Sequence, residues 1–250
     1  MTTHFHTLII FLTGSFLPLA PVSAAQSASF QAGIEAYEQG DYATAKTEFS
    51  NALETNETAA TRHNLALAEL QLENPAAAVW QLERALLLDP FNQTYREKLN
   101  LVRQQLELSA TTPKWYFRIA QLVSPGAWMM IATLSFWPLL AILILPRLNQ
   151  KKASARTQLA CLFSLFTLAL SCAAIWQNFK YLRTGIVVSD ETRPLHAAQA
   201  SAAPEIGFVR PGQRARVLDR HNNFYQVRTE SSATGWISKD DFRPLVFSRE

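Results

Sequence analysis

Catalytic and metal-binding sites are most often built from histidines, cysteines and clustered acidic side chains, and in this sequence these residues do not lie near one another. The three histidines beyond the N-terminal segment, His63, His196 and His221, are separated by long stretches of chain, and no cysteine or acidic cluster with metal-ligand spacing lies near them. No serine stands in a nucleophile-elbow motif, and the eight glycines form no phosphate-binding loop. We therefore expect a protein that is not an enzyme and that has no catalytic residue, metal or cofactor.

The two cysteines, Cys161 and Cys172, lie 11 residues apart. On a helix this spacing places them on one face, about 16 Å apart along the axis, so they cannot pair with each other. The pattern favours small apolar side chains at a helix contact. An intermolecular disulfide or an acylation site is the alternative.

Both cysteines fall in the second of two long apolar runs, which we expect to be transmembrane helices at residues 119–146 and 157–179. Between their flanking basic residues the runs hold 28 and 23 residues without Asp, Glu, Lys, Arg or His, more than the roughly 20 that a helix needs to cross a bilayer. The absence of ionisable residues within them argues against a transporter or channel. Small residues of the second run are expected to allow close packing: Ala169, Ser171, Ala173 and Ala174.

The loop between the two runs, residues 147–156, carries four positive charges and no acid: Arg147, Lys151, Lys152 and Arg156. Basic residues in short loops beside spans are retained in the cytoplasm. The loop is therefore predicted to be cytoplasmic, with both flanking domains on the periplasmic or extracytoplasmic side of the inner membrane.

Residues 1–25 have the pattern of a secretory signal peptide: an apolar run from Leu8 to Leu19, then a proline and small residues up to Ala25. The leading segment contains no Lys or Arg, so an uncleaved anchor is the alternative. In either case the segment that follows is exported, which agrees with the prediction from the loop charges.

The net charge of +3 hides a regional imbalance. Residues 26–112 have 6 basic and 12 acidic side chains, residues 113–183 have 8 and none, and residues 184–250 have 9 and 8. The basic residues therefore bracket the apolar runs, and no basic surface is left for a nucleic acid. Isolated acids of the first region, such as Glu35, Glu38 and Glu69, are expected on solvated helix faces.

A helical pattern repeats after 33 residues within 26–112, with small residues near Gly33 recurring near Ala66 and the string from Gly40 to Tyr42 marking the first turn. This pattern resembles the tetratricopeptide repeat, whose small residues let paired helices approach closely. We expect two repeats and a capping helix, with helices near 28–39, 43–54, 59–72, 76–88 and 92–108. Such a short array is marginal, so a partner or a second copy is expected to stabilise it.

The inward face of such repeats is formed by the first helix of each pair, which here offers Phe30, Ile34, Tyr37, His63, Asn64, Leu67 and Gln71. Repeat domains that bind a C-terminal carboxylate place Lys and Asn on these helices, and only Asn64 matches that pattern. An apolar groove for a peptide or helix fits better. The alternative is that these side chains pack within the repeat stack.

Residues 184–250 contain short β-rich runs near 185–188, 206–209, 214–218, 224–228 and 235–238, which predict a small all-β barrel. The string around Pro211 and Gly212 and the ending Gly235, Trp236, Ile237 resemble a bacterial SH3-type domain. Phe224, Tyr225 and Trp236 are a candidate aromatic patch for a peptide or a wall glycopeptide. Alternatively, at least one of them, Trp236 being the first choice, fills the core of the barrel.

The expected fold is thus a multidomain membrane protein: an all-α repeat domain, a two-helix transmembrane hairpin and an SH3-like barrel. This order resembles the BatE proteins of the Bat aerotolerance family. The resemblance implies a non-enzymatic partner of von Willebrand A-domain membrane proteins and a MoxR-type ATPase in envelope assembly or stress tolerance. We expect a membrane-anchored periplasmic scaffold that holds protein partners through both modules. The alternative is a sensor that binds peptidoglycan.

Overall fold

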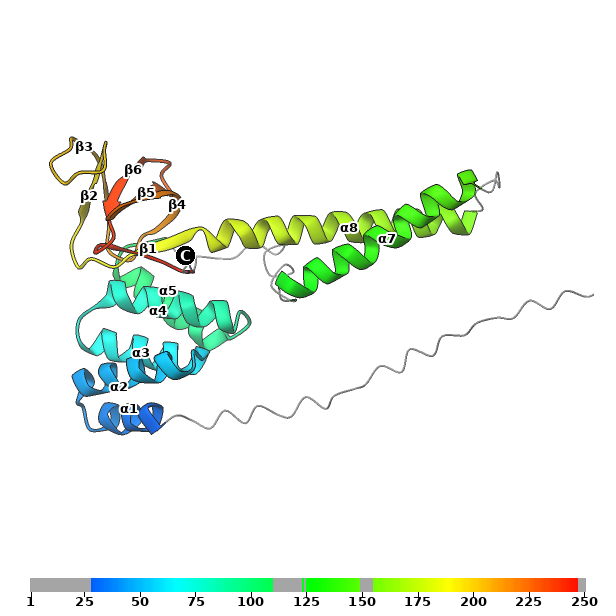
Figure 1. Cartoon of the computed structure of the whole chain (residues 1–250). Coiled ribbons are helices and arrows are strands. Elements are labelled where there is room, and N and C mark those ends of the chain that lie inside the picture. The colour runs from blue at the N-terminus through cyan, green and yellow to red at the C-terminus, as the bar shows by residue number, and fades with distance from the viewer. Residues whose placement is uncertain (1–27, 110–122, 124, 149–154, 247–250) are drawn as a thin grey trace, which may run out of the picture.

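The computed structural model describes residues 28–109, 123, 125–148 and 155–246. The predicted signal peptide and the loop residues Lys151 and Lys152 lie outside the described residues. Three parts follow one another along the chain: a stack of short helices, a pair of long helices, and a β-sheet domain (Figure 1). We refer to the first as the helical module and to the last as the β-domain.

The helical module consists of five helices whose ends lie within three residues of the predicted ones: α1 (Ala28–Glu38), α2 (Tyr42–Thr55), α3 (Ala59–Gln71), α4 (Pro75–Leu88) and α5 (Gln93–Gln105). Side-chain caps explain where three of them begin. Asp41, Thr58 and Asn92 each accept a hydrogen bond from the backbone N–H three residues on. Proline at the first position of α4 serves the same purpose, because its missing N–H would be unpaired there.

Two helical hairpins, α1 with α2 and α3 with α4, repeat the same internal packing. The equivalent residues 33 positions apart, such as Ala45 with Ala78 and Phe49 with Leu82, are buried in both hairpins. Gly33 shows why a small residue is needed, because a Cβ there would lie 2.6 Å from the ring of Phe49. The hairpins stack in chain order from α1 to α5 (Figure 1).

One of the acids predicted on a solvated face is buried. Glu35 and Glu38 are exposed, but Glu69 is only 4% exposed. Its carboxylate lies 3.1 Å from the Lys46 Nζ and accepts a hydrogen bond from the Asn74 amide. The expectation for Glu69 was wrong because its partners come from the neighbouring helix α2 and from the turn before α4, which helix periodicity alone does not reveal.

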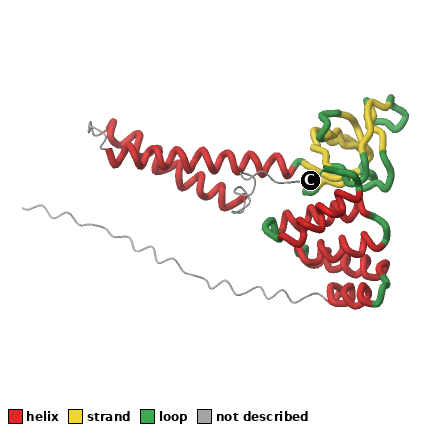
Figure 2. Tube along the Cα trace, turned by 180° about the vertical axis from the view of Figure 1, so that it is seen from behind, coloured by secondary structure: helices red, strands yellow, loops and turns green. Residues whose placement is uncertain are grey.

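The two long helices, α7 (Pro125–Leu148) and α8 (Ala155–Leu182), pack along each other and extend away from the rest of the molecule (Figures 1 and 2). Among the described residues, one stretch is long and apolar enough to cross a membrane, Gln158–Gln177 in α8; the apolar stretch of α7, Gly126–Leu140, is shorter. Their outer surfaces carry exposed apolar side chains such as Leu134, Phe163 and Phe166.

On α8 the contact with α7 is made largely by small and hydroxylated residues, and two of the four expected ones take part in it. Ser171 and Ala174 are buried, whereas Ala169, Ala173 and Cys172 are exposed and Cys161 is half-buried. The buried stripe runs Ser164, Thr167, Ser171 and Ala174, at spacings of three and four residues. Ser164 donates to the Ser135 carbonyl at 2.7 Å, and Thr167 donates to the Ser135 hydroxyl at 2.9 Å.

The β-domain is an antiparallel sheet of seven strands in the order β3-β2-β6-β5-β4-β1-β7. The strands are β1 (Thr184–Val187), β2 (Arg193–His196), β3 (Glu205–Val209), β4 (Arg214–His221), β5 (Phe224–Thr229), β6 (Thr234–Ser238) and β7 (Phe242–Pro244). The sequence predicted five of them. It missed β2 and β7 because each is short and contains a proline, which reads as a loop.

The core of the β-domain lies on one face of the sheet. Val187, Leu195, Val227 and Ile237 are buried there, with the ring of Tyr225 against that of Phe242 at 5.6 Å between centroids. Alternation along the strands turns their neighbours to the opposite face. Ile186 and Trp236 therefore lie outside this core, and Ile186 joins a different apolar cluster that includes α4.

Candidate functional site

The residues predicted to line a repeat groove lie on α1 and α3, and most of them are enclosed. Phe30 is buried in the core of the first hairpin, and Ile34 and Tyr37 pack against that core. His63, Asn64 and Leu67 are half-buried, and Gln71 is exposed. Phe30 thus follows the alternative reading of a side chain packed within the stack, and the accessible part of this face is on α3.

His63 marks where this face meets α5. Its ring stacks on Tyr95 with 4.7 Å between centroids, and its Nε2 is enclosed without a hydrogen-bond partner among the described residues. Burial lowers the pKa of His63 below its ordinary value of 6.5; a hydrogen bond with Asn64 opposes this shift, and the charge of Lys98 adds to it. The imidazole is therefore held neutral in the folded protein.

We expect this histidine to make the helical module less stable in acid. The unfolded chain binds the proton more readily than the folded one, so the contribution of neutral His63 is complete above pH 6.5 and is lost as the pH falls below it. Thermal unfolding of the detergent-solubilised chain at pH 8, 6.5 and 5 measures this. The fall in Tm between pH 6.5 and 5 should be smaller in His63→Phe, which keeps the stack but cannot titrate. Equal falls in both proteins would contradict it.

The three candidate aromatic residues of the β-domain do not share one exposed face. Phe224 and Tyr225 are neighbours on β5 and point to opposite sides of the sheet. Tyr225 is packed in the core against Phe242, while Trp236 lies across from Gln226 on the other face and is 8% exposed. Tyr225, rather than Trp236, is the member of the set that fills the core.

Strand β3 carries the largest exposed apolar side chains of the β-domain. Ile206 and Phe208 alternate along this edge strand and are 53% and 65% exposed. The sequence placed a strand here but could not distinguish this pair from core residues, because alternating apolar residues in a strand ordinarily mark the buried face.

The most extensive feature that the sequence did not reveal is the contact between the helical module and the β-domain. Helix α4 packs against β1, and one apolar cluster combines Val79, Trp80 and Leu82 of α4 with Ile186 and Leu245 of the β-domain. Nine of the 14 residues of α4 are buried, so the helix is enclosed on nearly all sides. The β-domain and α5 together cover the second hairpin, which was expected to need α5 alone or another molecule.

The C-terminal segment fastens this contact. After β7, Leu245 is fully buried in the apolar cluster, and its N–H donates to the Thr184 carbonyl at 2.9 Å. The indole of Trp80 donates to the Pro244 carbonyl at 3.1 Å, and Arg84 donates to the carbonyl of Leu245. Side chains of α4 therefore bind the backbone of this segment.

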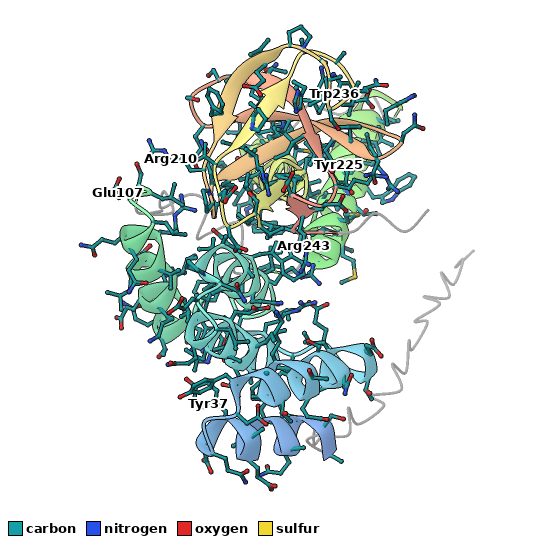
Figure 3. The ribbon with its side chains drawn as sticks, turned by 90° about the vertical axis from the view of Figure 1, so that its left-hand side faces the viewer. Tyr37, Glu107, Arg210, Tyr225, Trp236 and Arg243 are labelled. Carbon is teal, nitrogen blue, oxygen red and sulfur yellow. The ribbon has the colours of Figure 1, made fainter. Side chains whose placement is uncertain are left out.

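Two arginines enclose the Trp80 ring. The guanidinium of Arg62 from α3 lies 4.9 Å from the ring centroid and that of Arg243 from β7 lies 5.6 Å from it. Glu57 accepts hydrogen bonds from both Arg62 and Arg84, and these arginines lower its pKa although burial acts to raise it. Figure 3 shows Arg243 at the boundary between the β-domain and the helices, far from Tyr37 on α1.

A buried ionic group completes the interface. Glu83 of α4 and Arg103 of α5 are both 1% exposed, with 3.9 Å between the Arg103 Nη1 and the Glu83 carboxylate. Arg214 of β4 forms an ion pair with the same carboxylate, and Arg103 also lies 3.9 Å from Glu230 in the turn after β5. Charges buried this deeply require one another, so they fix how the two modules fit together.

The turn before β4 requires a glycine at position 212. Gly212 has a φ of +70°, and a Cβ there would lie 2.7 Å from the Leu106 side chain just after α5. Larger residues are thus disfavoured both by conformation and by contact. The exposed Glu107 of the helical module and the exposed Arg210 of the β-domain both lie at the left-hand edge of this boundary in Figure 3.

Among the described residues, no group of three His, Cys, Asp or Glu side chains could hold a metal ion. The buried and half-buried charged groups of the contact between the two modules are arginines and glutamates that pair with one another. The described part also offers partly accessible side chains on α3 and exposed apolar side chains on β3.

Comparison with known proteins identifies part of this chain. A family described as the bacterial SH3 domain matches residues 194–242, which cover β2 to β6 and the start of β7. Searches of curated proteins and of solved structures returned no significant match. The C-terminal part of the chain is therefore similar to bacterial SH3 domains, and the structure adds β1 in front of the matched residues and the rest of β7 behind them.

Proposed function

We propose that this chain is a non-enzymatic, membrane-anchored scaffold in which two binding modules act as one rigid unit. The observation that carries the proposal is the buried contact of Trp80 with Leu245 and of Glu83 with Arg214, which joins the segments before and after the long helix pair. Two modules fixed to each other hold their partners at a set distance. Tethering both partners to one membrane also raises their effective concentration.

The proposed partners are proteins. The equal packing of the two hairpins 33 residues apart supports tetratricopeptide repeats. We place a partner segment on the accessible part of α3, around Asn64 and Leu67. The resemblance to BatE proteins supports a Bat-type complex of the envelope, with von Willebrand A-domain membrane proteins and a MoxR-type ATPase as partners.

Two membrane spans with both modules outside the cytoplasm are part of this proposal. The apolar stretch of α8 and its close pairing with α7 support a hairpin of spans. The contact between the modules also supports it, because an even number of spans returns the chain to the side from which it came.

Affinity purification of the detergent-solubilised complex tests the scaffold. Replacing Asn64 and Leu67 by glutamate puts two charges on the face of α3, while the matched control replaces the exposed Thr47 and Asn51 of α2 in the same way. We expect the first variant to lose at least one co-purified protein that the control retains. An unchanged set of partners in both would contradict the role of α3.

A wall-binding sensor is the second candidate, because bacterial SH3 domains match residues 194–242 and such domains suit a peptidoglycan ligand as well as a protein. The short predicted inner loop, residues 147–156, offers little for a cytoplasmic partner to recognise. Sedimentation of the solubilised chain with purified wall sacculi discriminates between the two. Co-sedimentation supports the sensor, and a chain that stays in the supernatant supports the scaffold.

A further inference from the structure

The β-domain begins immediately where α8 ends. Only Arg183 separates Leu182, the last residue of α8, from Thr184, the first of β1. The strand register then places Arg216 of β4 opposite Thr184, and Arg228 of β5 opposite Arg216. With strands about 4.8 Å apart, Arg216 and Arg228 lie side by side across the sheet at the level where the long helix arrives. Arg183 adjoins them, because its carbonyl accepts a hydrogen bond from the Val217 N–H at 2.7 Å. We refer to the three arginines as the row.

The positive charge of this row is not balanced by any ion pair within the described part of the chain. Among the described residues, none of Arg183, Arg216 and Arg228 takes part in an ion pair, and the enclosed Arg216 Nε lacks a hydrogen-bond partner. Like charges directly opposite on neighbouring strands destabilise a sheet. Arg214, which lies two residues before Arg216 on β4 and further from α8, forms an ion pair with Glu83. The contrast indicates that the row meets an anion outside the chain.

The loop between α4 and α5 is a second feature on the side of the molecule from which the long helices extend. The loop between α4 and α5 projects toward the side of the helical module on which the helix pair lies, in both views of the molecule (Figures 1 and 2). It exposes Leu88 and Phe91, which are 45% and 44% accessible. The loop is braced by the Arg96 guanidinium, which donates to the Pro90 carbonyl at 2.5 Å, so both apolar side chains are held outward.

We propose that Arg183, Arg216 and Arg228, together with Leu88 and Phe91, dock the domain pair on the anionic lipid headgroups of the membrane that α8 enters. The inference rests on α8 lying in a membrane, as in the proposed function. The apolar stretch of α8 ends at Gln177, six residues before Arg183, or about 9 Å along the helix. A headgroup layer is about 5–8 Å thick, so the row lies at the outer edge of this layer, where the long arginine side chains can reach lipid phosphates.

Arginine footprinting on the full chain in nanodiscs tests the proposal. Phenylglyoxal modification is followed by mass spectrometry in discs of phosphatidylcholine alone and in discs with about one third phosphatidylglycerol. We expect Arg183, Arg216 and Arg228 to react about fivefold more slowly in the anionic discs, the effect of one basic residue near such a surface. High salt should abolish the difference, because the screening length falls to about 3 Å at 1 M. The exposed Arg210 is the internal control.

The apolar part is tested with a matched pair of variants. Phe91→Asp should raise the reactivity of the three arginines in anionic discs toward the neutral-disc value, whereas Phe208→Asp on β3 should leave it unchanged. Equal reactivity in both kinds of disc would overturn the headgroup site while leaving the anchor intact. Protection in neutral discs by inorganic phosphate or by peptidoglycan fragments would also overturn it. Failure of the chain to enter either disc would contradict the membrane anchor itself.

Discussion

Replacing Leu245 by aspartate is expected to separate the helical module from the β-domain. Leu245 is fully buried in the cluster that contains Trp80 and Ile186. Loss of a buried leucine costs about 2–5 kcal/mol, and a carboxylate in its place adds the cost of an unpaired buried charge. The hydrogen bonds that the Trp80 and Arg84 side chains donate to the carbonyls of Pro244 and Leu245 would be lost with it.

Differential scanning calorimetry and limited proteolysis of the detergent-solubilised chain measure this separation. The wild-type domain pair should unfold in one transition, and Leu245→Asp should show two, with cleavage appearing between the modules. Phe208→Asp is the control, since Phe208 is 65% exposed and surface substitutions usually change stability by less than about 0.5 kcal/mol. A single transition at the wild-type temperature in Leu245→Asp would show that the contact is not needed to hold the modules together.

Replacing Glu83 by glutamine is expected to cost about 3–5 kcal/mol of stability, because it removes the charge that compensates two arginines in a buried site. Arg103 is 1% exposed and cannot regain water, while Arg214 reaches the same carboxylate from the β-domain. The effect should therefore appear in the transition of the domain pair and not only in the helical module.

Chemical denaturation of a double-mutant cycle tests this assignment. Glu83→Leu combined with Arg103→Met should be less destabilised than the sum of the two single variants, since removing both charges leaves neither of them unpaired. The matched control combines the exposed Glu54 of α2 with the exposed Arg210 of the β-domain, where replacement by leucine and methionine should give additive changes. Additive losses at Glu83 and Arg103 would mean that the two side chains do not act as a pair.

Local patterns allowed much of this fold to be predicted. The 33-residue spacing of small residues predicted the first four helices of the helical module, because each hairpin needs a small residue wherever its helices touch, as at Gly33 against Phe49. The fifth helix was predicted from the helical spacing of its apolar residues. Alternation predicted five strands, and the bacterial SH3 resemblance was confirmed over residues 194–242. The missing strands β2 and β7 contain Pro194 and Pro244, whose local signal opposes a strand even though the sheet accommodates both.

The contact between the modules could not be predicted from the sequence. Glu83 and Arg103 look like members of solvated helix faces, and they are buried only because the β-domain covers them. Arg214, which pairs with Glu83, lies 131 residues after it in the sequence and beyond the helix pair. The candidate aromatic patch could not be judged from the sequence for the same reason. Strand alternation predicts that Phe224 and Tyr225 lie on opposite faces of the sheet. Which face is buried depends on the position of Phe242, which packs against Tyr225.

Reporter fusions that map the sides of the membrane test the central claim most directly, since the domain pair can form only if both modules emerge on one side. The fusions are placed after Thr112, at Gln150 and after Glu250. The account predicts that the first and last report an extracytoplasmic position and that the one at Gln150 reports the cytoplasm. Reporters at Gln150 and Glu250 on the same side would contradict the two-span hairpin and, with it, the scaffold.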